Sequence, residues 1–189
     1  MKSFSAKSIA AAVIGAAFFF VLGRYAAVPG GMASLGATFD YGILAFVLLA
    51  VISAIWGPAA GVICGCLGAF LVDVSRYGMN GFWWYNYAGV IVFAFLVGLM
   101  TQKLTLYDGR LSKKDLIGFN CSQAVAAVVA RGTLQPLLEL LIEREPAKHV
   151  FTQGLAQAGF MLVFTALLGT AALFIYSFIS AMRNSKKRK

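Results

Sequence analysis

Long apolar runs that recur along the chain constrain its fold more than any other feature. The 189 residues are 60% hydrophobic and 12% charged, whereas an average soluble domain is about 25% charged. Each helix that crosses a lipid bilayer needs roughly 20 mostly apolar residues. We therefore predict an all-α membrane protein with a single domain. Its six transmembrane helices are expected at residues 7–25, 41–56, 58–74, 82–100, 115–132 and 151–179.

The distribution of basic residues predicts how these helices are oriented. Lys and Arg collect at the cytoplasmic ends of membrane helices, and six spans place both termini on one side. If that side is cytoplasmic, it holds eleven of the sixteen basic residues. We therefore predict a multi-pass protein of the cell membrane with both termini in the cytoplasm. The five basic residues left at the outer ends are Arg24, Arg76, Arg131, Arg144 and Lys148.

The net charge of +9 does not indicate a nucleic-acid partner. The basic residues flank apolar segments, and no nucleic-acid recognition motif accompanies them. The basic tail at residues 183–189 is instead predicted to stop at the anionic cytoplasmic face of the lipid bilayer.

The stretch at residues 73–87 combines six aromatic side chains with one acid, one base and two asparagines. Aromatic faces offer flat apolar area, and a few polar groups beside them fix the orientation of a ligand. Trp and Tyr also collect at membrane interfaces as an aromatic belt. The stretch alone therefore leaves two interpretations, a binding pocket and a belt.

The predicted orientation brings polar and aromatic residues of all six helices to the external end. Polar groups inside a span are costly and generally face the bundle interior or a cavity, so this convergence favours the pocket. The candidate substrate-binding residues are Arg24, Asp40, Tyr41, Asp73, Tyr77, Trp83, Trp84, Asn86, Tyr87, Arg131, Gln153 and Gln157.

Two segments are predicted to cover this end. Residues 26–40 hold Pro29-Gly30-Gly31 and Gly36, a density of turn residues typical of a loop. Residues 133–149 are expected outside the membrane, because Pro136 interrupts the helical pattern. Within them, residues 137–142 have one apolar and one charged side, which predicts a short interfacial helix acting as a lid.

The first helix carries a strip of small residues. Ser8, Ala12 and Ala16 recur every four residues and so share one face. In lipid, small residues let helix backbones approach closely. The strip has two interpretations, packing inside the protein's own bundle and a docking face for another membrane subunit.

The sequence lacks the motifs of several function classes. It has no phosphate-binding loop of an ATPase, and no paired acids or Ser-base arrangement of an enzyme, so no catalytic activity is predicted. Cys64-x-Cys66 has no partner pair or nearby His, and His149 lies in the external segment. We therefore predict no metal site and no cofactor of the protein's own.

The chain resembles the substrate-binding S component of energy-coupling factor (ECF) transporters. Within that group it is similar to an uncharacterised family often labelled riboflavin or cobalamin uptake. The resemblance covers nearly the whole chain. It is carried by Ser8-x-x-x-Ala12-x-x-x-Ala16, by Phe18 to Arg24, by Trp56-Gly-Pro-Ala-Ala-Gly61 and by Asp73 at the end of the third helix.

The resemblance implies how such a chain works. An S component binds a vitamin from outside and docks through the Ala-x-x-x-Ala face onto a membrane scaffold subunit that is coupled to two ATPases. Ser8, Ala12 and Ala16 would then be the docking positions. The outward cluster would hold the vitamin, with cobalamin favoured and riboflavin as the alternative. A stand-alone facilitator and a structural membrane protein remain the rival classes.

Overall fold

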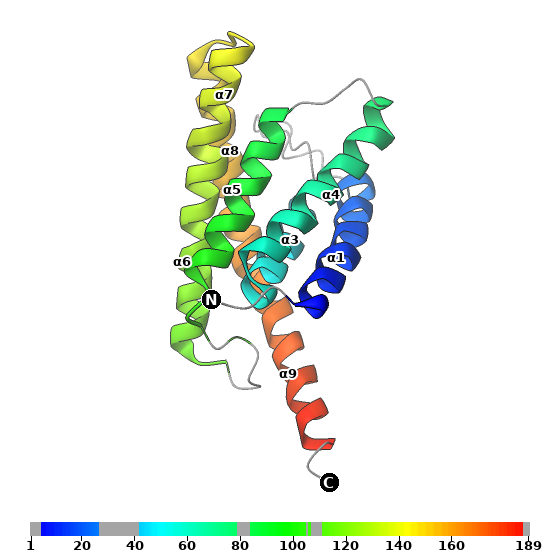
Figure 1. The fold of residues 1–189 in the computed structure, drawn as a ribbon. Helices are drawn as coiled ribbons and strands as arrows, with labels where there is room; N and C mark the ends of the chain where they lie inside the picture. The colour runs from blue at the N-terminus through cyan, green and yellow to red at the C-terminus, as the bar shows by residue number, and fades with distance from the viewer. Residues whose placement is uncertain (1–4, 27–41, 79–83, 105, 107–110, 187–189) are drawn as a thin grey trace.

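The computed structural model describes residues 5–26, 42–78, 84–104, 106 and 111–186. Within these ranges every regular element is helical, and the helices form six rods (Figure 1). Four rods are single helices, namely α1 (Ala6–Tyr25), α3 (Ile43–Trp56), α4 (Pro58–Tyr77) and α5 (Trp84–Met100). The fifth rod consists of α6 (Lys113–Ala127), the π-helix η2 (Val128–Leu134) and α7 (Gln135–Ile142). The sixth consists of α8 (Ala147–Phe164), the π-helix η3 (Thr165–Gly169) and α9 (Thr170–Lys186).

Length and hydropathy confirm the predicted all-α membrane bundle. Four rods are long and apolar enough to cross a membrane: Ala6–Tyr25, Pro58–Tyr77, Lys113–Ile142 and Ala147–Met182. The other two, in α3 and α5, are shorter apolar helices. Figure 1 shows that the rods run alternately up and down, so that α1 begins and α9 ends toward the same end of the bundle.

Local signals explain where two of the helices begin. Between α3 and α4, Gly57 has a φ of 94°, in the left-handed region that favours glycine. Pro58 follows in the first turn of α4, where its missing N–H costs nothing. At the start of α6, Ser112 and Asp115 form a reciprocal capping box, which satisfies two exposed backbone N–H groups.

The small-residue strip of α1 lies inside the bundle, which contradicts the predicted docking role of Ser8, Ala12 and Ala16. Ala12 is 0% and Ala16 3% exposed, and Ser8 is also buried. The main neighbour of α1 is α4. The contact is so close that a Cβ on Gly68 would lie 2.6 Å from the Phe19 ring. Side chains enclosed in this way cannot contact another protein, so internal packing is the correct interpretation.

Phe46 lies at the centre of the apolar core. Its ring is T-shaped against Phe19 of α1, with centroids 6.3 Å apart, and against Phe93 of α5 at 5.5 Å. All three side chains are fully buried. Edge-to-face packing of this kind favours one orientation of each ring, so the core fixes how α1, α3 and α5 sit beside one another.

The fifth rod continues where a break was predicted. Residues Lys113–Ile142 form one helical run of 30 residues, which corrects both the helix end at residue 132 and the separate lid at residues 137–142. The π-helix η2 ends two residues before Pro136, which is buried in the first turn of α7. A π segment changes the hydrogen-bond register of a helix, and the rod passes Pro136 without ending.

The sixth rod is the longest. Ala147–Met182 spans 36 residues, or about 54 Å at 1.5 Å per residue, against a hydrocarbon core of about 30 Å. It therefore tilts or extends beyond the membrane. At the start of α9 it meets α6 through a polar contact, in which the Asn120 amide donates to the Thr170 hydroxyl at 3.2 Å.

Candidate functional site

Arg131 is the most deeply buried charged residue that the sequence placed in the site. It lies in η2 and is 0% exposed. Its Nη1 donates a hydrogen bond to Oε1 of Gln135, and its guanidinium carbon lies 4.7 Å from the centroid of the Phe46 ring. A charge inside a membrane bundle is costly unless it is held by such contacts, and it marks a functional position.

Gln135 and Glu139 extend this contact along the same face of the fifth rod. Nε2 of Gln135 donates to Oε1 of Glu139 at 2.8 Å, so Arg131, Gln135 and Glu139 are linked at intervals of four residues. Sequence analysis missed Gln135 and Glu139 as site residues. Their spacing was the available signal, but it becomes meaningful only when the helix continues past Pro136.

The sixth rod brings Gln153 and Gln157 to the same region. Gln157 is 3% exposed and Gln153 is half-buried. Their helix α8 packs closely on η2 and α7, because a Cβ on Gly154 would lie 2.6 Å from the Arg131 carbonyl oxygen. The two glutamines are four residues apart on α8. They therefore share one face of a helix that packs against the rod carrying Arg131.

Asp73 and Tyr87 form a second polar pair, between α4 and α5. Asp73 is buried, and Tyr87 is half-buried with its hydroxyl enclosed beside the Asp73 carboxylate, without hydrogen-bond geometry. Gly89, two residues after Tyr87, faces Arg131 and Gln135 instead. Residues two apart point to nearly opposite sides of a helix, so α5 stands between the two polar groups.

Arg24 and Tyr77 lie at the ends of α1 and α4 and are exposed. The Arg24 guanidinium carbon is 5.5 Å from the centroid of the Tyr25 ring. Nearby, Nη2 of Arg76 donates to the carbonyl oxygen of Gly23 at 2.6 Å, which ties α4 to the last turn of α1. The described side chains of the candidate site thus include a buried group around Arg131 and an exposed group around Arg24.

Five other predicted site residues are not described in full. Asp40, Tyr41 and Trp83 lie outside the described residues, and Trp84 and Asn86 are described only as backbone positions in α5. The sequence predicted that these polar and aromatic residues meet at one end of the bundle. Among the described residues, the structure shows one polar group around Arg131 and another at Asp73 and Tyr87, on opposite sides of α5.

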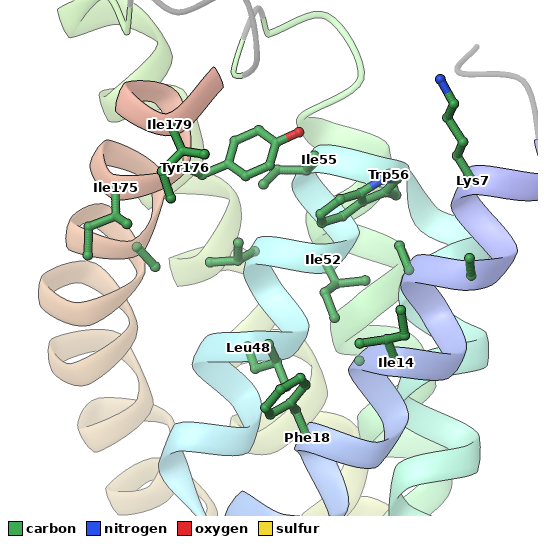
Figure 2. Close-up of a pocket in the computed structure, with 15 residues that line it drawn as sticks. Lys7, Ile14, Phe18, Leu48, Ile52, Ile55, Trp56, Ile175, Tyr176 and Ile179 are labelled. Carbon is green, nitrogen blue, oxygen red and sulfur yellow. The ribbon is translucent and has the colours of Figure 1, made fainter. Parts of the chain in front are cut away.

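A separate apolar groove opens toward the opposite end of the bundle, between α1, α3 and α9. It has a volume of about 660 Å³. Figure 2 shows Lys7, Trp56 and Tyr176 around one end of the groove and Phe18 toward the other. The rings of Trp56 and Tyr176 meet edge to face with centroids 5.7 Å apart. Ala11 and Gly15, the small residues beside the buried strip of α1, contribute to its lining.

Comparison with known proteins identifies the family. Residues 3–178 match the model of the "ECF-type riboflavin transporter, S component" family. The chain belongs to this S-component family. The match runs from before α1 into α9 and therefore includes both polar groups and every lining residue of the groove except Ile179.

Curated relatives extend over the same length as this S-component chain. UPF0397 proteins of Staphylococcus aureus strains bovine RF122 / ET3-1 and MRSA252 are each 34% identical over 188 residues, covering 100% of the chain and 98% of the relative. No solved structure shows a significant match. Membership of an S-component family places the protein among membrane transport components, which are not a class of enzymes.

Proposed function

We propose that the chain is the riboflavin-binding subunit of an ECF transporter in the cell membrane. In this role it captures the vitamin outside the cell and delivers it together with a scaffold subunit and two ATPases. The observation that carries the proposal is the family match over residues 3–178. The proposal assigns the chain no catalytic step and no cofactor other than the transported ligand.

The proposed orientation follows the charge pattern. Lys7 lies in the first turns of α1, at the end of the bundle toward which α9 also runs (Figure 1). Because positively charged flanks favour the cytoplasmic side, this end faces the cytoplasm in the proposal. The other end, where α7 meets α8, then faces outward, and Arg131 is reached from outside.

The proposed ligand site is built around Arg131, with Gln157 and Gln153 beside it and Asp73 and Tyr87 across α5. A guanidinium donates in the plane of its five N–H groups, and the ring system of riboflavin carries carbonyl oxygens that accept such bonds. The remaining predicted residues are proposed for the outer part of the site, where aromatic faces stack on a flat ring. They are Arg24, Asp40, Tyr41, Tyr77, Trp83, Trp84 and Asn86.

Riboflavin is preferred over cobalamin because the family description names it. The cobalamin prediction rested on resemblance alone, and no contact between described residues favours a corrin ring. Cobalamin is therefore the competing ligand when the co-purifying molecule is identified.

The groove between α1, α3 and α9 is the proposed docking site for one apolar helix of the scaffold. Its walls are almost entirely apolar. Ala11 and Gly15 leave room for a neighbouring backbone, as small residues do at helix contacts in lipid. It lies at the end proposed to be cytoplasmic, where the ATPases must couple to the membrane subunits.

The most direct test is to identify the molecule that co-purifies with the chain. Absorbance and mass spectrometry are expected to show riboflavin, or an empty protein that binds riboflavin without ATP. A corrin spectrum would replace the proposed substrate with cobalamin. Riboflavin movement into liposomes that contain the chain alone would instead support a stand-alone facilitator and contradict the subunit role.

A further inference from the structure

Gln135 connects a buried cation to an acid closer to the surface. It is 3% exposed, and both ends of its amide are used. Oε1 accepts from Nη1 of Arg131, while Nε2 donates to Oε1 of Glu139 at 2.8 Å. The three side chains share one face of the fifth rod because they are spaced four residues apart.

The two contacts fix the orientation of the Gln135 amide. If the amide were flipped, its NH₂ group would face the guanidinium and its oxygen would face the carboxylate, which places donor against donor and acceptor against acceptor. Glu139 therefore holds Nε2, and in doing so keeps Oε1 directed at Arg131. Because a guanidinium is rigid and planar, holding Nη1 restricts the direction of all its N–H groups.

The neighbouring helix leaves space for this arrangement at Gly89. A Cβ on Gly89 would lie 3.2 Å from Oε1 of Gln135 and 3.8 Å from Nε of Arg131. The first distance is shorter than an ordinary van der Waals contact, so a side chain there would displace the amide slightly. On another side, the Phe46 ring lies against the guanidinium.

We propose that Gln135 is a positioning residue that orients the Arg131 guanidinium toward bound riboflavin, with Glu139 setting the amide and Gly89 leaving room for it. The inference rests on the proposed function. Gln135 does not contact the ligand in this account, because it acts through Arg131.

The test compares riboflavin affinity and thermal stability of the purified full chain for a series of Gln135 variants. Gln135→Leu removes both hydrogen bonds and is expected to raise the Kd roughly tenfold or more, the usual effect of losing a hydrogen bond to a charged group. Gln135→Glu combined with Glu139→Gln still accepts from Arg131 and keeps a donor facing an acceptor between positions 135 and 139, so it is expected to restore the Kd to within about threefold of the native value. Gln102→Leu, in the turn after α5, is the matched control and is expected to leave the Kd unchanged.

Each outcome decides the inference. Equal riboflavin affinity of Gln135→Leu and the native chain overturns it and leaves the proposed function intact. Equal losses in Gln135→Leu and in the Gln135→Glu/Glu139→Gln double variant also overturn it, since the restored acceptor should rescue binding. If Gln135→Leu does not fold, Gly89→Ala replaces it, with a severalfold higher Kd expected and an unchanged Kd overturning the inference. Failure of the native chain to bind riboflavin removes the proposed function and the inference together.

Discussion

The guanidinium carbon of Arg131 lies 4.7 Å from the centroid of the Phe46 ring, in the interior of a membrane bundle. Phe46 is itself held edge to face by Phe19 and Phe93. The aromatic core therefore supports one face of the guanidinium while Gln135 holds its edge. The apolar packing that stabilises the fold thus also positions the charge proposed to contact the ligand.

Replacing Arg131 by Lys is expected to weaken riboflavin binding about tenfold or more. Lysine keeps the charge but loses the planar fork and its stacking on the aromatic ring. Isothermal titration of the purified variant measures the change. Arg144→Lys, at the exposed turn after α7, is the control and should bind like the native chain. Native affinity in Arg131→Lys would show that the guanidinium is not a ligand contact.

Replacing Ala11 by Trp is expected to stop riboflavin uptake in cells while riboflavin binding by the purified chain stays intact. The large side chain would fill part of the groove in which the scaffold helix is proposed to dock. Ala17→Trp is the matched control, because Ala17 is exposed on α1 but does not line the groove. Equal uptake by the two variants would contradict docking in this groove.

Replacing Gly98 by Ala is expected to destabilise the bundle by about 1–3 kcal/mol, the usual cost of overpacking a tight contact. A Cβ on Gly98 would lie 2.5 Å from Cα of Pro58, where the backbone of α4 begins. Gly159→Ala is the control, since nothing lies within 4 Å of its added Cβ, and Ala favours a helix by up to about 1 kcal/mol. Thermal unfolding in detergent should give Gly98→Ala a lower melting temperature than Gly159→Ala. The reverse order would mean that α4 and α5 are not in such close contact.

The aromatic contact between Trp56 and Tyr176 is expected to couple α3 to α9. Rings packed edge to face contribute about 0.5–1.5 kcal/mol beyond their buried area. A double-mutant cycle of Trp56→Ala and Tyr176→Ala, read by unfolding free energy, should give a coupling energy in this range. Strictly additive effects would indicate that α9 is not held to α3 at the edge of the groove.

Hydropathy predicted the six rods because each contains an apolar run, although α3 and α5 are shorter than the roughly 20 residues of a full span. Asp115 was expected near the start of the fifth helix, and the structure places it in the capping box with Ser112. These features depend on local sequence. Which face of α1 the rest of the bundle covers does not, and the burial of Ala12 and Ala16 could not be predicted from their spacing.

The candidate site was predictable only in part. Arg131 and Gln157 were expected to face the interior because polar groups in a span avoid lipid, and both are buried. Gln135 was missed because Pro136 was interpreted as a break, whereas a π segment lets the helix continue. The separation of Tyr87 from Arg131 follows from the rotation of α5, which its apolar pattern does not determine.

Titration of riboflavin with the purified full chain, in the absence of ATP and of any partner subunit, tests the central claim most directly. We predict saturable quenching of riboflavin fluorescence with one ligand per chain, and weaker quenching for Arg131→Lys. A folded, monodisperse protein that shows no saturable quenching would contradict the account.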